Sequence, residues 1–156
     1  MKMKFRKKID RFVVLVLLII MSSMVLTVLW QVFSRYVLEN PSSFTEELAR
    51  YLMIWLGVLG AAYVSGKNNH VSINYFYLKF SIKNQIILKK IIILIIILFV
   101  LLAFVIGGSR LVYITYVLGQ FSPALQIPLS IIYSVLPVSG LLIIFYKLSD
   151  LINYNN

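Results

Sequence analysis

The sequence predicts an all-α membrane protein with four transmembrane helices and a short amphipathic helix on the cytoplasmic membrane surface. Hydrophobic residues make up 61% of the 156 residues, and the mean hydropathy is +0.94, whereas a soluble domain is nearer to half apolar. The apolar residues gather in four long runs, and a helix that spans a membrane needs roughly 20 such residues. We therefore expect a single membrane domain over residues 1–156, with no room for an additional soluble domain.

The first apolar run, residues 12–34, follows the basic segment MKMKFRKKIDR. A basic start before an apolar run is also typical of a secretory signal. This run is too long for one, lacks a small-residue cleavage site and is followed by further spans, so we expect a retained transmembrane helix. Trp30 and Tyr36 near its far end are typical of an aromatic belt at the membrane interface.

The second span is expected at residues 44–65. Pro41 prevents the first helix from continuing, and Ser43 with Glu46 matches a capping box. Small side chains recur at every fourth position of this span, which lets another helix approach closely. We expect close packing, within this chain or against a partner, at Gly57, Ala61 and Ser65.

The turn between these two spans gathers charge. It holds three of the five acidic residues, Glu39, Glu46 and Glu47, together with Arg35 and Arg50. Glu46 and Arg50 are four residues apart and therefore share a helix face. Two interpretations stay open at this point. The group is either a helix cap with a local ion pair, which contributes little to stability, or an outward-facing rim where a partner docks.

Residues 66–85 form a polar and basic connection. Ile73, Phe76, Tyr77 and Phe80 fall on one helical face, which predicts the amphipathic helix on the cytoplasmic surface; an irregular loop with snorkelling lysines is the alternative. His70 is the only histidine, and no carboxylate lies near it in sequence. A structural or interfacial role is therefore favoured over metal binding.

The third span is expected at residues 86–108, with Lys89 and Lys90 as interface anchors at its start. A continuous helix to Leu118 would be about 50 Å long, which exceeds the ~30 Å hydrocarbon core. It must therefore tilt, kink near Gly107 and Gly108, or project from the bilayer. Arg110 is expected at the far interface, because a charge at mid-bilayer costs ~2.5–3.5 kcal/mol or more.

The fourth span is expected at residues 128–147. A turn punctuated by Gly119, Pro123 and Pro128 precedes it, and Pro137 should kink it. With the amino end inside, twelve basic residues lie on the cytoplasmic side and only Arg35, Arg50 and Arg110 lie outside. This bias predicts that both termini are cytoplasmic.

Several function classes have little support in the sequence. The chain has no cysteine, which excludes disulfides and thiolate metal sites. The net charge of +10 follows from the basic cytoplasmic side, and no basic groove with stacking aromatics indicates nucleic-acid binding. We expect no cofactor, no metal site and no enzymatic activity, because catalytic groups do not converge at a recognisable spacing.

The middle of each span is uncharged, whereas a transport pathway usually keeps ionisable groups at mid-membrane. Ser22, Ser23, Thr27 and Gln31 give the first span a polar stripe, for which hydrogen bonds between helices are favoured over a substrate path. These features favour a chain without a transport pathway of its own. Two other interpretations stay open: an autonomous small four-helix exporter that acts as a homo-oligomer, or an assembly protein unrelated to transport.

Several short motifs recur along the chain in a fixed order: Phe33-Ser34-Arg35-Tyr36, Pro41, Thr45-Glu46-Glu47 with Arg50, Trp55, Gly60-Ala61-Ala62, His70-Val71 with Ile73-Asn74, Ile127-Pro128, and Tyr133 with Pro137. Together these motifs resemble one known family, the DctQ-like small membrane subunit of tripartite ATP-independent periplasmic (TRAP) transporters. The resemblance covers nearly the whole chain. Phe44 stands where the family often has Trp, and Asn74 where it often has Asp.

The resemblance implies a bacterial inner-membrane subunit with two partners, a large membrane subunit and a periplasmic substrate-binding protein. In such transporters the large subunit moves the substrate by an elevator motion coupled to sodium. The substrates are organic acids, including dicarboxylates and sialic acid. The small subunit would then brace the large one, with Arg35, Glu46, Glu47 and Arg50 at the periplasmic docking rim and the surface helix at the cytoplasmic side.

Overall fold

The computed structural model describes residues 2–40, 42–67 and 82–153, and the regular elements in these ranges are all helical. Four of the described helices are long and apolar enough to cross a membrane, which confirms the predicted fold class. The predicted surface helix with Ile73, Phe76, Tyr77 and Phe80, and also His70, lies outside the described residues. The elements are α1 (Lys2–Tyr36), α2 (Ser43–Gly66), α4 (Ile82–Val100), the π-helical segment η1 (Leu101–Gly107), α5 (Gly108–Val117), α6 (Leu129–Tyr133) and α7 (Val135–Asn153).

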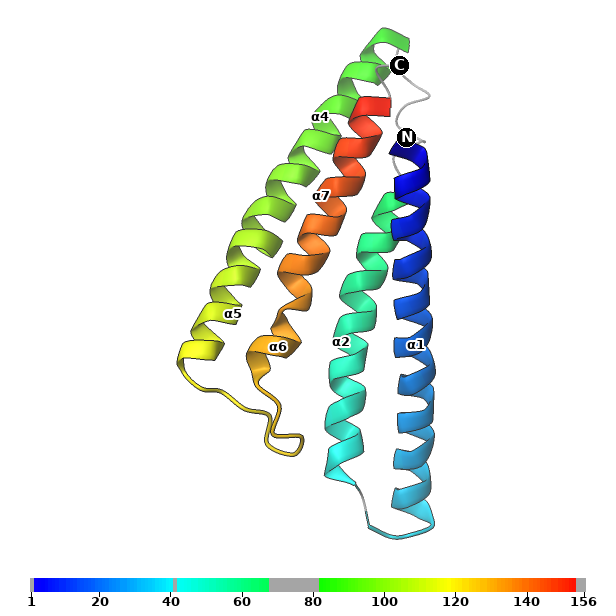
Figure 1. Ribbon diagram of the computed structural model, residues 1–156, viewed down its shortest axis with the longest axis vertical. Coiled ribbons are helices and arrows are strands. Elements are labelled where there is room, and N and C mark those ends of the chain that lie inside the picture. Colours follow the sequence, from blue (N-terminus) through cyan, green and yellow to red (C-terminus); the bar gives the residue numbers. More distant parts are fainter. Residues whose placement is uncertain (1, 41, 68–81, 154–156) are drawn as a thin grey trace.

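The helices stand side by side, in the order α1, α2, α7 and then the long helix made of α4, η1 and α5 (Figure 1). The fourth helix of the sequence therefore lies between the second and the third. The start of α1, the end of α7 and the start of α4 share one end of the molecule. The turn between α1 and α2 and the loop between α5 and α6 share the other (Figure 1). A row of helices with an uncharged middle and two polar ends suits a bilayer, because charged side chains in the hydrocarbon core are costly.

The core between these helices is small. One cluster joins Ile20 of α1, Leu59 of α2 and Val135 of α7. A second joins Ala62 of α2, Val100 of α4 and Ile143 of α7. Most other large apolar side chains face outward, which in water would be unfavourable. This outward apolar surface is what lipid tails or a membrane partner can cover.

The third transmembrane helix runs without a break from Ile82 to Val117, beyond the predicted end at residue 108. It changes to π-helix over Leu101–Gly107, the place where the sequence predicted a kink as one of three solutions. Helix α7 comes close here. A Cβ atom added to Gly140 would lie 2.8 Å from the Cβ of Phe104, so only a glycine permits this approach.

The fourth transmembrane helix is interrupted at Ser134, between α6 and α7. Pro137 has no backbone N–H to donate to the carbonyl of Tyr133, and its ring crowds that carbonyl. The interruption therefore falls within one turn before the proline, where the sequence predicted a kink. The proline ring also packs tightly on α5, because a Cβ atom added to Gly108 would lie 3.0 Å from Cδ of Pro137.

Candidate functional site

Charged side chains occupy the two ends of the helix row and leave its middle uncharged. Residues 12–34, 51–66, 91–109 and 111–146 contain no Asp, Glu, Lys, Arg or His. In the described part of the chain, no group of three metal-binding side chains comes together. The Thr27 hydroxyl donates to the Ser23 carbonyl of its own helix at 2.7 Å rather than to another helix, contrary to our expectation. The candidate functional surfaces therefore lie at the ends and on the outer faces.

The predicted rim is only partly exposed. Glu46 and Arg50 form an ion pair at 3.4 Å on the outer surface of α2, as their spacing predicted. Arg35 is exposed in the last turn of α1. An exposed pair of this kind contributes only about 0.3–0.5 kcal/mol to stability, so these side chains can engage another molecule without loss to the fold.

The cap of α2 lies one residue earlier than we expected. Ser42, not Ser43, is the N-cap residue, and its hydroxyl oxygen accepts from the amide of Thr45 at 3.4 Å. Glu46 pairs with Arg50 on the helix surface. The capping box predicted from Ser43 and Glu46 is therefore wrong, because the helix begins where the side chain of Ser42 can reach a free amide.

Glu47 does not belong to the exposed rim, because its side chain turns inward. One carboxylate oxygen accepts from the amides of Ala124 and Leu125 at 2.7 and 3.0 Å, and the other from the hydroxyl of Tyr51 at 2.7 Å. Hydrogen bonds to a carboxylate are shorter and stronger than those between neutral groups. Glu47 thus ties the start of α2 to the loop between α5 and α6 and is not available for docking.

The loop that Glu47 holds is compact. Gly119 ends α5 with a positive φ of 57°, and the amide of Gln120 donates to the carbonyl of Thr115 at 3.1 Å, the arrangement of a Schellman cap. The buried Ser122 donates its amide to Ile127 at 2.9 Å and closes the loop. The amides of Ala124 and Leu125 in this closed loop point toward the carboxylate of Glu47, which accepts a hydrogen bond from each.

A second polar cluster joins three helices at the opposite end, and the sequence did not reveal it. The guanidinium of Arg6 pairs with Asp150 of α7 at 2.6 Å, donates to the Gly66 carbonyl at the end of α2, and lies 5.5 Å from the ring centre of Tyr146. Gly66 must be small here, because an added Cβ atom would lie 2.7 Å from the Tyr146 ring.

Asp10 and Lys147 complete this cluster. The Tyr146 hydroxyl donates to Asp10 at 2.7 Å, and Lys67 approaches the same carboxylate at 3.7 Å. The adjacent Tyr63 hydroxyl, and secondly Asp10, raise the pKa of Lys67 above its usual value. Lys147, which is 3% exposed, donates to the Ser65 carbonyl at 2.9 Å. Cations from two other helices therefore satisfy the last carbonyls of α2.

The predicted small-residue face of α2 does not pack against any other described part of the chain. Gly57 and Ala61 are exposed, and a Cβ atom added to Gly57 would meet nothing within 4 Å. Ser65 is buried instead and does not share that face. The exposed face continues with Met53 and Val64, each at least half exposed. Close helix contacts inside the chain occur at other glycines, at Gly66, Gly108 and Gly140.

Most of the predicted interface anchors are exposed on the outside of the helices. Trp30 and Tyr36 are exposed, and Trp30 packs against Phe33 with ring centres 5.9 Å apart. Lys90 and Arg110 are exposed, while Lys89 is half-buried. These placements agree with side chains at the two edges of a bilayer, although contact with lipid stays a prediction.

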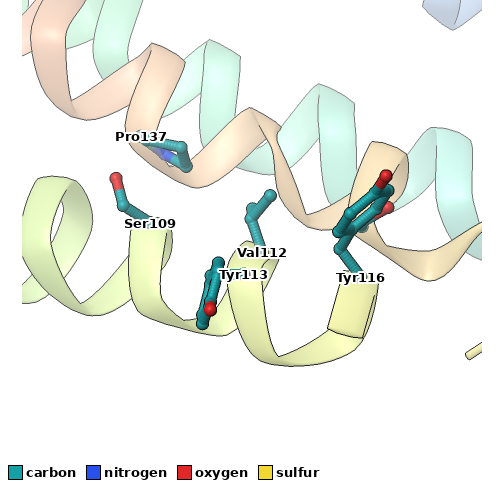
Figure 2. Close-up of a pocket in the computed structure, with 6 residues that line it drawn as sticks. Ser109, Val112, Tyr113, Tyr116 and Pro137 are labelled. Carbon is teal, nitrogen blue, oxygen red and sulfur yellow. The ribbon is translucent and has the colours of Figure 1, made fainter. Parts of the chain in front are cut away.

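A groove of about 330 Å³ lies between α5 and the broken fourth helix (Figure 2). Its lining carries hydroxyl groups and apolar side chains but no charged group: Ser109, Val112, Tyr113 and Tyr116 of α5, Ser130 of α6 and Pro137 of α7. It opens to the outside beside exposed tyrosines. Such a groove offers hydrogen bonds but no charge to pair with an acidic substrate.

Four apolar helices with an uncharged middle and two polar ends define a small multi-span membrane protein. Residues 24–154 match the DctQ component of tripartite ATP-independent periplasmic transporters. The chain therefore belongs to the DctQ family and is the small permease subunit of a TRAP transporter, a transport protein and not an enzyme. As a component of such a transporter it is a multi-pass membrane protein that works with the other TRAP subunits.

Two relatives agree with this assignment. A TRAP transporter small permease protein of Haemophilus influenzae is 31% identical over 134 residues, which cover 86% of this chain and 81% of the relative. The sialic acid TRAP transporter small permease protein SiaQ of Vibrio cholerae is 31% identical over 71 residues, 46% of this chain. The match spans 41% of the length of SiaQ.

Proposed function

We propose that this chain is an accessory subunit that braces the large elevator subunit of a TRAP transporter and helps to dock the periplasmic binding protein. The transporter imports an organic acid of the dicarboxylate or sialic-acid class, and sodium coupling resides in the large subunit. The chain lies in the bacterial inner membrane with both termini cytoplasmic. The uncharged middle of the helix row carries this proposal, because an organic acid and a sodium ion both need charged or strongly polar partners along their path.

The face of α2 that holds Met53, Gly57 and Ala61 is the surface for the large subunit. Among the described residues, nothing packs closely against Gly57, and Ala61 is exposed. In a bilayer, helices associate through close packing of such residues, because lipid tails provide no hydrophobic drive for association. A helix of the partner can approach this face without moving any side chain of the bundle.

Bulky substitutions on this face test whether it contacts the large subunit, because they should not disturb the packing inside the bundle. Gly57→Leu and Ala61→Leu should leave the fold of the isolated chain unchanged and reduce co-purification of the large subunit several-fold. Ala103→Leu is the matched control, because Ala103 is also small and exposed but lies on η1. Normal recovery of the complex with both α2 variants would exclude this face as the contact.

Docking of the binding protein rests on the exposed rim. The double exchange Glu46→Arg/Arg50→Glu preserves the ion pair and the net charge but inverts their direction. A role confined to bracing α2 predicts normal uptake by this variant, whereas a docking role predicts reduced uptake with an intact membrane complex. Uptake at the wild-type rate would remove the rim from the proposal.

Substrate, coupling and topology are tested in proteoliposomes that contain the two membrane subunits and the binding protein. Uptake of dicarboxylates and of sialic acid is measured with and without a sodium gradient. The accessory role predicts no uptake when this chain is reconstituted alone, whereas an autonomous exporter predicts transport without the large subunit. Topology is tested with a reporter protein that is active only in the cytoplasm. It should be active when it is fused to either end of the chain.

A further inference from the structure

The outward face of the first turns of α1 is a cationic stripe. Lys7, Lys8 and Arg11 are exposed and lie on one helix face, at positions i, i+1 and i+4. Lys7, Lys8 and Arg11 make no ion pair with any residue in the described ranges. Three adjacent cations therefore repel one another unless an outside anion lies against them.

The acids near this stripe are committed to the interior. Asp10 receives the Tyr146 hydroxyl at 2.7 Å and faces Lys67, while Asp150 pairs with Arg6 at 2.6 Å. Arg6 and Asp10 are four residues apart and occupy the inward face of α1. The cluster inside the bundle thus uses both carboxylates and leaves the stripe without neutralisation.

The same outward face becomes apolar within one turn. Phe12 is 68% exposed, and Leu15 and Leu18 are exposed below it. Side chains that pass from apolar to cationic along one lipid-facing stripe match the order of acyl chain and headgroup in a phospholipid. In a bilayer, this order would set the cations at the depth of the phosphates and the apolar side chains against the acyl chains.

We propose that this stripe binds anionic phospholipid headgroups and selects them over zwitterionic ones. The occupant is a lipid and not a free phosphate, because exposed Phe12 and Leu15 provide the contact for its acyl chains. Cations next to a membrane helix attract anionic lipid by about 1 kcal/mol each, which is about fivefold in affinity per cation. Removal of two should weaken binding ~25-fold.

The test uses the full-length chain in detergent, titrated with phosphatidylglycerol or with phosphatidylethanolamine of the same acyl chains and followed by native mass spectrometry. The variant Lys7→Gln/Arg11→Gln is compared with Arg35→Gln/Arg110→Gln, which removes the same net charge at the other end. Lys7→Arg/Lys8→Arg keeps the stripe charged. We expect phosphatidylglycerol to bind more tightly than phosphatidylethanolamine, and only the first variant to lose this preference.

The wild-type chain alone already provides a decisive measurement. Binding of phosphatidylglycerol should weaken when the salt concentration rises from 0.05 to 0.5 M, about the range over which the Debye length falls from above 10 Å toward 3 Å. Glycerol 3-phosphate at millimolar concentration should not displace the lipid. Equal affinity for the two lipids, equal losses in the two glutamine variants, or displacement by the soluble phosphate would each overturn the proposal.

Discussion

Alanine in place of Gly66 should destabilise the bundle although alanine is the better helix former. An added Cβ atom would lie 2.7, 2.8 and 2.9 Å from Cδ2, Cγ and Cδ1 of Tyr146, whereas carbon atoms prefer ~3.5–4.0 Å. The Tyr146 ring is fully buried, its hydroxyl is bound to Asp10, and Arg6 covers one face. The ring therefore cannot turn aside without loss of these contacts.

The magnitude follows from two opposing effects. Overpacking of a filled site costs about 1–3 kcal/mol, and the gain of alanine over glycine is at most ~1 kcal/mol and smaller at a helix end. Gly66→Ala should therefore lower the free energy of unfolding by about 1–2 kcal/mol. Gly57→Ala in the same helix meets no atom within 4 Å and should be neutral or stabilising, by up to ~1 kcal/mol.

The assay is unfolding of the purified chain by sodium dodecyl sulfate in mixed micelles, followed by circular dichroism. Gly66→Ala should lower the midpoint of unfolding. Gly57→Ala should raise the midpoint or leave it unchanged. Combining Gly66→Ala with Tyr146→Leu tests the cause, because a smaller side chain opposite should remove the cost of the methyl group. Equal stability of Gly66→Ala and Gly57→Ala would refute the reasoning.

Two further predictions concern the polar contacts at each end. Glu47→Gln places an amide among three donors, so the amides of the loop at residues 124 and 125 should exchange their hydrogens at least ~10-fold faster in a hydrogen-exchange experiment; the exposed control Glu46→Gln should leave them unchanged. Tyr146→Phe keeps the ring but removes the hydrogen bond to Asp10, and the unfolding free energy should fall by about 1.5 kcal/mol or more; Tyr113→Phe, an exposed tyrosine, should have no effect, and a similar loss in both would contradict this role.

The parts of the fold that depend on neighbours in sequence could be predicted. Four apolar runs of about the length of a membrane crossing specify four helices whatever their partners are. The ion pair of Glu46 with Arg50 follows from helix geometry alone. Gly119 ends α5 because glycine adopts a positive φ without steric cost. The interruption before Pro137 follows from the missing N–H and the ring of proline.

Glu47 shows where such reasoning stops. Glu46 and Glu47 are chemically identical neighbours, and both satisfy the preference for acids in a first helical turn. Only the loop that supplies the amides of Ala124 and Leu125, more than 70 residues later, makes one of them interior. The sequence also did not decide whether the small-residue face of α2 packs within the chain or against a partner. A periodic pattern defines a helix face but does not identify the element that packs against it. Tyr51, one turn after Glu47, was the available signal for the inward face.

The glycines give the same lesson in another form. Gly57 belongs to a regular line of small residues and was therefore predicted as a packing site, yet a Cβ atom added to it would meet no described atom within 4 Å. Gly66, Gly108 and Gly140 belong to no such line, yet each permits a close contact between α7 and a neighbouring helix. The need for a small residue at these places arises from where Tyr146, Pro137 and Phe104 lie, which is a property of the assembled helices.

The two polar ends would make the exposed face of α2 a rigid contact in the bracing role that we propose. Glu47 fixes one end of the helix to the loop after α5, and Arg6 and Lys147 fix the carbonyls at the other end. The two fixed points are separated by roughly 28 Å of helix, close to the full thickness of the hydrocarbon core. A helix held at both membrane edges cannot tilt independently of α1 and α7, so a partner that packs against Gly57 engages the whole bundle. A stationary brace for a moving subunit requires this property, and a lone hydrophobic helix would not provide it.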